Sequence, residues 1–360
     1  MQWYCCRSHH VTEDVLTALS YYHGAPQVSA RYKQENADFK VIEQLDVDAE
    51  ESGEHQWLWV YKNGANTTFV ARQLADFAGV NERQVSYAGL KDRNAETWQW
   101  FSVHLPGVDM LDWHTLTHPE FRVERALLRS KKLKSGYHNG NLFRLRLRDV
   151  SDVAALESRW QKLISQGVPN YFGEQRFGRE GQNLAKAGVW LRGELSKKQV
   201  RKWSRQQQGM LLSSVRSYLF NKIVSSRIAE QRMQPEAGDF MLLAGSRSFF
   251  QVGTVDDALL ARWRSGDILL SAPMAGSWRG PWQEHLSNFE YEQLQDEEEL
   301  VAGLQRQRVD LARRAVLMQL EDAHLQVVAD DMVDLQFRLP TGCFATSVLR
   351  ELILTAKEEG

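Results

Sequence analysis

The chain carries short runs in which apolar side chains alternate with polar ones, typical of β-strands because successive side chains point to opposite faces. The predicted strands are 39–45, 56–61, 85–89, 97–103, 142–148 and 333–339. In the segment 142–148, three apolar residues alternate with three arginines. One face of that strand is predicted to be core, and the other a cationic ladder suited to phosphate or a charged edge that favours solubility.

Apolar residues at helical spacing predict three helices. The first begins at Asn66 or Thr67 and ends at Gly79, and the second is opened by Ser151 and closed by Gly167. A third is predicted from about residue 305 to 319. After Gly167 the composition turns glycine-rich, aromatic and basic, which predicts a domain boundary. The elements together predict a mixed α/β protein.

Composition and length indicate an ordinary globular protein of two or three domains. Of the 360 residues, 43% are hydrophobic and 25% charged, and no apolar run approaches the roughly 18 residues of a membrane helix. The first sixteen residues lack the apolar centre of a signal peptide, so a cytoplasmic location is expected. The three cysteines have no paired spacing, which argues against disulfides.

The charge is unevenly distributed, although its net value is only −2. Residues 122–148 hold nine Lys or Arg and one acid, and residues 195–229 hold eight and no acid. A solvated helix face is the ordinary origin of such a run. Because aromatic residues are interleaved with both stretches, they also fit a surface that follows nucleic-acid phosphates and stacks on bases.

The segment VSYAGLKDRNAETWQWFSV, residues 85–103, contains the strongest candidate for chemistry. Its pattern predicts a loop between two strands, and the carboxylate of Asp92 lies in that loop. A loop aspartate commonly caps a turn or a short helix. Three residues on stands Ala95 rather than Glu or Gln, so the capping box is missing. The pattern is compatible with a cap and with a catalytic carboxylate.

Five blocks of the sequence resemble those of the TruD family of tRNA pseudouridine synthases, in the family's order. They are KQENADFKVIE, GLKDRNAET, YHNGNLFRLRLR, PNYFGEQRFGREGQN and RLPTGCFATSVLREL. A single short motif recurs by chance, whereas five in order do not. The resemblance extends from about Leu19 to Thr355.

The resemblance implies a pseudouridine synthase catalytic domain with a mixed, mainly antiparallel sheet, interrupted by an inserted α/β domain. The catalytic domain is expected at 17–166 and 316–360, and the insertion at 167–315. Residues 1–16 have no family counterpart and are expected to be a disordered extension. Their Cys5-Cys6 pair, with two nearby histidines, does not predict a metal site, because adjacent cysteines do not fit the spacing of zinc ligands.

In the family, the aspartate after Gly-x-Lys is the catalytic nucleophile, a role that the resemblance gives to Asp92. The reaction breaks the bond between N1 and the ribose C1′, turns the base and rejoins it through C5. A carboxylate can attack C1′ or remove the C2′ proton, and either role needs it ionised. No metal, nucleotide or redox cofactor is implied. Gly173, Gly178 and Gly181 lack a P-loop ending and are expected to form tight turns or to cradle RNA backbone.

Three further residues match family positions that contact the substrate: Phe39, Asn141 and Phe344. They offer two aromatic planes and an amide that can both donate and accept a hydrogen bond. Base stacking suits the aromatic planes, because an extruded uridine has to be recaptured. Core packing is the alternative for either phenylalanine, since this residue type is commonly buried.

The expected partner of Asp92 is Arg350, whose setting VLREL resembles the family's hydrophobic-Arg block. A nearby cation favours the charged form of a carboxylate. Lys33 and Lys91 are the alternatives, and Lys91 is expected to contact phosphate.

The implied partner is tRNA, with uridine 13 in the D arm as the target, and neither DNA, membrane nor an obligate protein partner is indicated. Two other classes of protein fit part of the pattern. A noncatalytic RNA-binding module would not need Asp92. A glycosidase-like hydrolase would need a second carboxylate, for which Glu96 is the nearest candidate.

Overall fold

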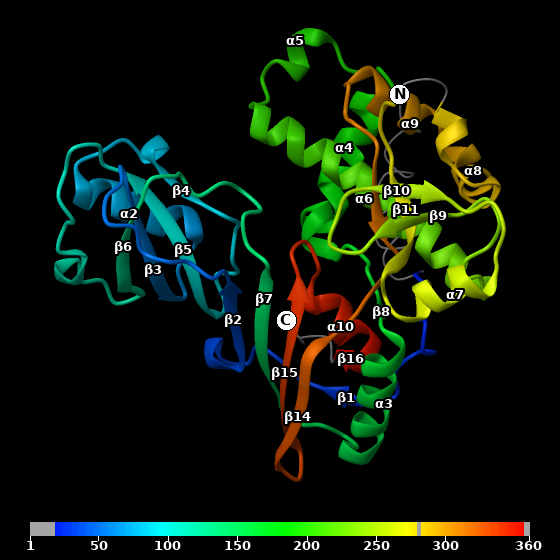
Figure 1. Ribbon diagram of the computed structural model, residues 1–360, viewed down its shortest axis with the longest axis horizontal. Helices are drawn as coiled ribbons and strands as arrows, with labels where there is room; N and C mark the ends of the chain where they lie inside the picture. The colour runs from blue at the N-terminus through cyan, green and yellow to red at the C-terminus, as the bar shows by residue number, and fades with distance from the viewer. Residues whose placement is uncertain (1–18, 279–281, 356–360) are drawn as a thin grey trace, which may run out of the picture. The chain divides into compact units, whose positions relative to one another are not determined.

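The computed structural model describes residues 19–278 and 282–355 (Figure 1). The longer strands are β2 (Phe39–Gln44), β3 (His55–Asn63), β4 (Val85–Tyr87), β5 (Glu96–His104), β6 (Phe121–Arg129), β7 (Gly140–Leu147), β9 (Phe240–Leu243), β10 (Phe249–Gln251), β11 (Ile268–Met274), β12 (Ala312–Ala315), β14 (Glu321–Ala329) and β15 (Met332–Pro340). Two-residue strands are β1 (Ser29–Ala30), β8 (Val168–Pro169), β13 (Leu317–Met318) and β16 (Leu354–Thr355). The helices are α2 (Thr67–Ala78), α3 (Val153–Gln166), α4 (Gln182–Leu191), α5 (Lys197–Val200), α6 (Arg205–Ala229), α7 (Asp257–Arg264), α8 (Asn288–Leu294), α9 (Glu298–Arg306) and α10 (Ala345–Leu352). The predicted mixed α/β class is confirmed, and each of the six predicted strands is present.

The chain folds as two compact units. Among the described residues, the sheet unit comprises 26–166, 319–345 and 352–355, and the helical unit comprises 19–25, 167–278, 282–318 and 346–351. The chain thus passes from the sheet unit to the helical unit at residue 167. The assignment of catalytic and inserted domains to particular residues stays a prediction.

The sheet unit is built on one eight-stranded sheet. Its strand order is β14-β15-β7-β2-β5-β3-β6, and β4 pairs with β5. Every neighbouring pair is antiparallel except β2 and β5. The sheet is therefore mixed and mainly antiparallel, as expected.

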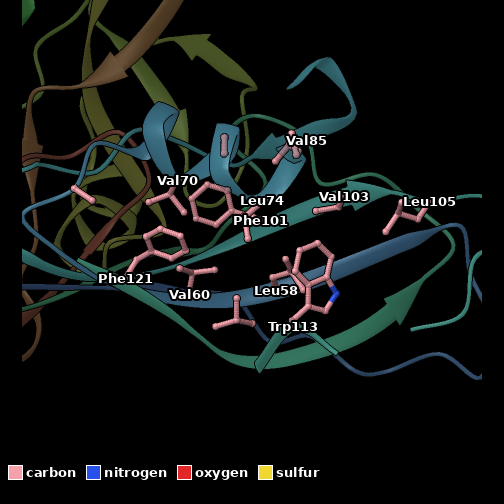
Figure 2. Packing of buried hydrophobic residues seen from close by; sticks show 14 residues of the cluster. Leu58, Val60, Val70, Leu74, Val85, Phe101, Val103, Leu105, Trp113 and Phe121 are labelled. Atoms are coloured by element: carbon pink, nitrogen blue, oxygen red, sulfur yellow. The ribbon is translucent and has the colours of Figure 1, made fainter. Parts of the chain in front are cut away.

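Helix α2 covers one end of this sheet and closes a hydrophobic core over β3 and β5 (Figure 2). Val70 and Leu74 of the helix pack with Leu58 and Phe101 of the strands, all completely buried. The helix ends at Gly79, whose φ of 64° is the left-handed conformation that glycine adopts without steric cost. Both predicted ends of this helix are confirmed.

The arginine face of β7 alternates with its core face as predicted, but carboxylates neutralise much of it. Arg146 donates two hydrogen bonds to Asp334, at 2.7 and 2.8 Å, and Arg148 donates two to Asp38, at 3.0 and 2.8 Å. Paired guanidinium groups hold fewer donors for phosphate. Two arginines of the predicted cationic ladder are therefore neutralised, because β15 and the segment before β2 bring acids to Arg146 and Arg148, whereas Arg144 bonds the neutral Gln336.

The helical unit is organised around the long helix α6 and the antiparallel sheet β10-β9-β11-β12. Arg313 of β12 forms an ion pair with Glu290 of α8, and both side chains are fully buried. No helix in the described part of the chain is long and apolar enough to cross a membrane.

The predicted helix at 305–319 is wrong. Helix α9 ends at Arg306, and the chain turns through Arg308, which has a φ of 55°, into strands β12 and β13. Strand β12 pairs with β11, and β13 with β8. The apolar spacing resembled a helix, but strand partners distant in the sequence determined the conformation.

Candidate active site

Asp92 lies in the loop between β4 and β5, which pair as an antiparallel hairpin. Residues 93–95 form a bend that leads directly into β5, so no helix begins at Asp92. The helix-cap alternative is thereby excluded. The Asp92 side chain is 32% exposed, so the carboxylate is partly buried and also accessible from solvent.

Lys33 forms an ion pair with this carboxylate. Its Nζ donates to Oδ2 of Asp92 at 2.9 Å, and it lies 4.0 Å from the centroid of the Phe39 ring. The lysine backbone has a φ of 59°, a left-handed conformation that a non-glycine residue adopts at an energetic cost. Lys33 is thus held by the Asp92 carboxylate and the Phe39 ring, and it places a positive charge beside the carboxylate.

Lys91, the neighbour of Asp92, connects two strands of the sheet. Its Nζ lies 3.1 Å from Oε2 of Glu43 on β2 and donates to Oδ1 of Asn141 on β7 at 2.6 Å. The Lys91 side chain is only 6% exposed. This enclosure favours a positioning role for Lys91 over the phosphate contact expected from the sequence.

The contact with Lys91 determines which way the Asn141 amide is turned. An ammonium group has three donors and no acceptor, so the atom that faces it must be the amide oxygen. The NH₂ group of Asn141 is then directed elsewhere as a donor. The neighbouring Gly140 permits the close approach of β15 to β7, because a Cβ at that position would lie 2.3 Å from the Leu339 carbonyl oxygen.

The two candidate aromatic residues differ in exposure. Phe39 is 2% exposed, its ring centroid lies 6.3 Å from that of Phe143, and Lys33 Nζ lies over the ring. This placement favours core packing that supports Lys33. Phe344 is half-buried and immediately precedes α10. Of the two rings, Phe344 is the more accessible to a base.

Arg350 lies on the part of α10 that belongs to the helical unit. Its guanidinium donates to the main-chain oxygens of Leu19 and Ser20 and to Oε1 of Glu351 at 3.1 Å. The pairing of Arg350 with Asp92 stays a prediction.

Residues predicted to bind RNA backbone have distinct environments. All five basic residues of the segment 197–205 are exposed, and the Trp203 ring in this segment packs on Trp190 at 5.6 Å. Gly178 and Gly181 have φ values of 76° and 67°, which favours the tight-turn alternative for these glycines. No group of three His, Cys, Asp or Glu residues in 19–278 and 282–355 could hold a metal ion. Residues 1–16, with their cysteines and histidines, lie outside the described part.

Sequence reasoning missed Glu43, Lys62 and Gln99. All three are fully or almost fully buried. The signal was present, because each polar residue is in phase with apolar core positions of its strand: Glu43 with Val41, and Lys62 with Val60. A charged residue at a core position is rare unless it is paired, and so marks a site that uses the charge.

The match to a family model places the chain in the class of the pseudouridine synthases, and the fold agrees with it. The model of the family described as tRNA pseudouridine synthase D (TruD) matches residues 16–198 and 182–352. A crystal structure of a putative tRNA pseudouridine synthase D from Methanosarcina mazei superposes with a TM-score of 0.69, covering 94% of this chain and 98% of that one. Its sequence identity of 20% shows the likeness of fold alone.

Curated relatives are similar over almost their whole length. The tRNA pseudouridine synthase D of Idiomarina loihiensis is 46% identical over 340 residues, which is 94% of this chain and 96% of that protein. The protein of the same name from Proteus mirabilis is 42% identical over 341 residues, again 94% and 96%. The chain belongs to the TruD family of tRNA pseudouridine synthases, which are isomerases.

Proposed function

We propose that this protein isomerises uridine to pseudouridine at position 13 of cytoplasmic tRNA, with Asp92 as the nucleophile. The assignment of Asp92 rests on one observation, the ion pair with Lys33 at 2.9 Å on a partly exposed loop. The pair places a positive charge beside the carboxylate, and the exposure gives a ribose access to it. Attack on C1′ and removal of the C2′ proton both need the carboxylate in its ionised form.

The target uridine has to leave the folded RNA to reach Asp92, at a cost of a few kcal/mol. Stacking on an aromatic ring returns about 1–3 kcal/mol per base, and Phe344 is the ring proposed for this role. The NH₂ group of Asn141, turned by Lys91, is a donor suited to a carbonyl oxygen of uracil. We assign the choice of base to these two residues.

The exposed basic segment 197–205 is the proposed docking surface for the tRNA backbone. Its charges are not neutralised by acids within the stretch 195–229, which contains none. Phosphate contacts of this kind position the RNA without reading its sequence.

A glycosidase-like reaction is disfavoured by the surroundings of Glu96. Its carboxylate lies 3.0 Å from Lys40 Nζ and accepts a hydrogen bond from the Tyr61 hydroxyl at 3.2 Å. Both contacts occupy the Glu96 carboxylate within the sheet, whereas a catalytic acid has to be free to face the substrate.

The function is tested by replacing Asp92 with asparagine and by using Glu96→Gln as the matched control. Asp92→Asn should abolish release of tritium from C5-labelled uridine in tRNA, while tRNA affinity stays within about tenfold, or about 1.4 kcal/mol. Glu96→Gln should keep most of the activity. Turnover by Asp92→Asn would refute the nucleophile. Release of free uracil by the wild type, together with loss of activity in Glu96→Gln, would support the hydrolase. Mapping pseudouridine in tRNA from cells with and without the gene tests the position.

A further inference from the structure

Lys62 is a completely buried lysine at the end of β3, in phase with Leu58 and Val60 of the hydrophobic core. Its Nζ donates to the main-chain oxygen of Asp92 at 2.6 Å and to that of Ala65 at 3.0 Å. Lysine is almost never fully buried unless a partner compensates the lost hydration. Here the bonded partners are carbonyl groups, one of which belongs to the proposed nucleophile.

Two neutral buried side chains, Thr67 and Gln99, also bind the loop that contains Asp92. The amide of Lys91 donates to Oγ1 of Thr67 at 3.0 Å, and that hydroxyl donates to Oε1 of Gln99 at 3.0 Å. The Gln99 NH₂ group donates to the carbonyl oxygen of Gly89 at 3.2 Å. Residues 89–92 are therefore fixed by buried side chains at both ends.

We propose that Lys62 is a positioning residue for the isomerisation, whose buried ammonium fixes the backbone at Asp92 and places a positive charge near its carboxylate. The inference rests on the proposed role of Asp92 as nucleophile. A shift of about 1 Å in a reacting group can cost about 100-fold in rate, so a strong anchor has a clear use there. A neutral donor could make the hydrogen bonds, but only a charged one adds the field.

Burial and the charges of Asp92 and Lys91 act on the pKa of Lys62. Burial lowers the pKa of Lys62 to about 8, and the neighbouring charge of Lys91 acts in the same direction, whereas the Asp92 carboxylate opposes the shift. The residues in register with it on β5 and β6 are Thr97 and Phe121, which do not ionise near neutral pH. Lys91 is itself paired with Glu43, and Asp92 with Lys33.

This placement predicts opposite responses of activity and stability to alkaline pH. The pKa of Lys62 is depressed in the folded protein relative to 10.5, so above pH 8 the unfolded chain binds more protons at this position. The contribution of Lys62 to stability therefore rises with pH in that window. Activity should fall over the same range, because the ammonium loses its charge. A merely structural lysine would give no such fall.

The experiment compares Lys62→Met, Lys62→Arg and Thr67→Val with the wild type in single-turnover reactions on saturating tRNA from pH 6 to 9.5. Lys62→Met should lower the rate about 100-fold with tRNA Kd within about threefold. Lys62→Arg, whose guanidinium stays protonated, should recover part of that loss and lack the alkaline fall. Thr67→Val removes a loop hydrogen bond without removing the charge, and should keep the alkaline fall. A Lys62→Met rate within threefold of wild type would overturn the proposal.

Two measurements keep the test decisive if a variant does not fold or if the proposed function fails. A wild-type rate that is flat to pH 9.5 would by itself contradict the proposal. Absence of pseudouridine in the wild-type reaction refutes the function and leaves the anchoring to be judged by hydrogen exchange. The amides of residues 88–95 should exchange at least about tenfold faster in Lys62→Met, and unchanged exchange would refute the anchor.

Discussion

Two charged residues near Asp92, Glu43 and Lys62, occupy strand positions where the alternating pattern predicts core side chains. Glu43 and Lys62 are buried as deeply as the apolar residues beside them. Burying such groups is costly unless each is bonded, and each is: Glu43 accepts from the amide of Trp100 at 3.1 Å, and Lys62 donates to carbonyl groups. The free-energy cost of burying these two charged groups is a reason to connect them with the chemistry at Asp92.

Truncation of Phe344 tests whether its ring stacks on the base or packs in the core. If the half-buried ring stacks on uracil, Phe344→Ala should lower turnover by about 1–3 kcal/mol, or about 5- to 150-fold, and weaken tRNA binding less. If the ring is core, truncation should instead cost about 3–5 kcal/mol of unfolding free energy. Single-turnover rates and thermal unfolding of the same variant distinguish the two. A variant that melts early but is fully active below its melting point would contradict the stacking role.

Pairing between elements places the site residues opposite one another. Glu43 of β2 and Asn141 of β7 are partners in the antiparallel ladder, so both lie within reach of Lys91. The hairpin of β4 and β5 presents the loop that holds Asp92. A shift of one residue in either register would move these side chains to the other face of the sheet.

In the helical unit, α8 and β12 are joined by the buried pair Arg313–Glu290. Burial raises the pKa of Glu290 and lowers that of Arg313, and the opposite charge of each partner counters the shift. Removing one partner leaves an isolated buried charge, so Arg313→Met should lower the unfolding free energy by about 3–5 kcal/mol. The exposed pair Arg262–Asp267 gives the control, because Arg262→Met should cost less than about 1 kcal/mol. Equal urea midpoints for the two variants would contradict this expectation.

At the scale of the whole molecule, the distribution of charge matters more than its net value of −2. Charge reversal at Lys197 and Lys198 should weaken binding of all tRNAs alike. It should also flatten the log-log salt dependence by about 0.7 to 0.9 per lost phosphate contact. Lys162→Glu, an exposed position of α3 outside both basic stretches, is the control. Filter binding across salt concentrations measures both quantities, and an unchanged slope would mean that the segment 197–205 is only a solvated face.

The sequence by itself determined the class of fold, six strands, two helices and the family. Hydrophobic periodicity and the residues that end helices are local signals. The helix end at Gly79 and the alternation in β7 could therefore be recognised without knowing which elements pack against them. The five family blocks made the loop of Asp92 recognisable in the same way.

The tertiary structure alone decided which side chains meet. It turned 312–318 into strands, placed acids against Arg146 and Arg148, and brought Lys33 to Asp92 across 59 residues of sequence. These outcomes depend on strand pairing and on desolvation, and neither can be inferred from a short stretch of sequence. Periodicity reveals that a side chain is buried, but only the folded chain determines which group compensates its charge.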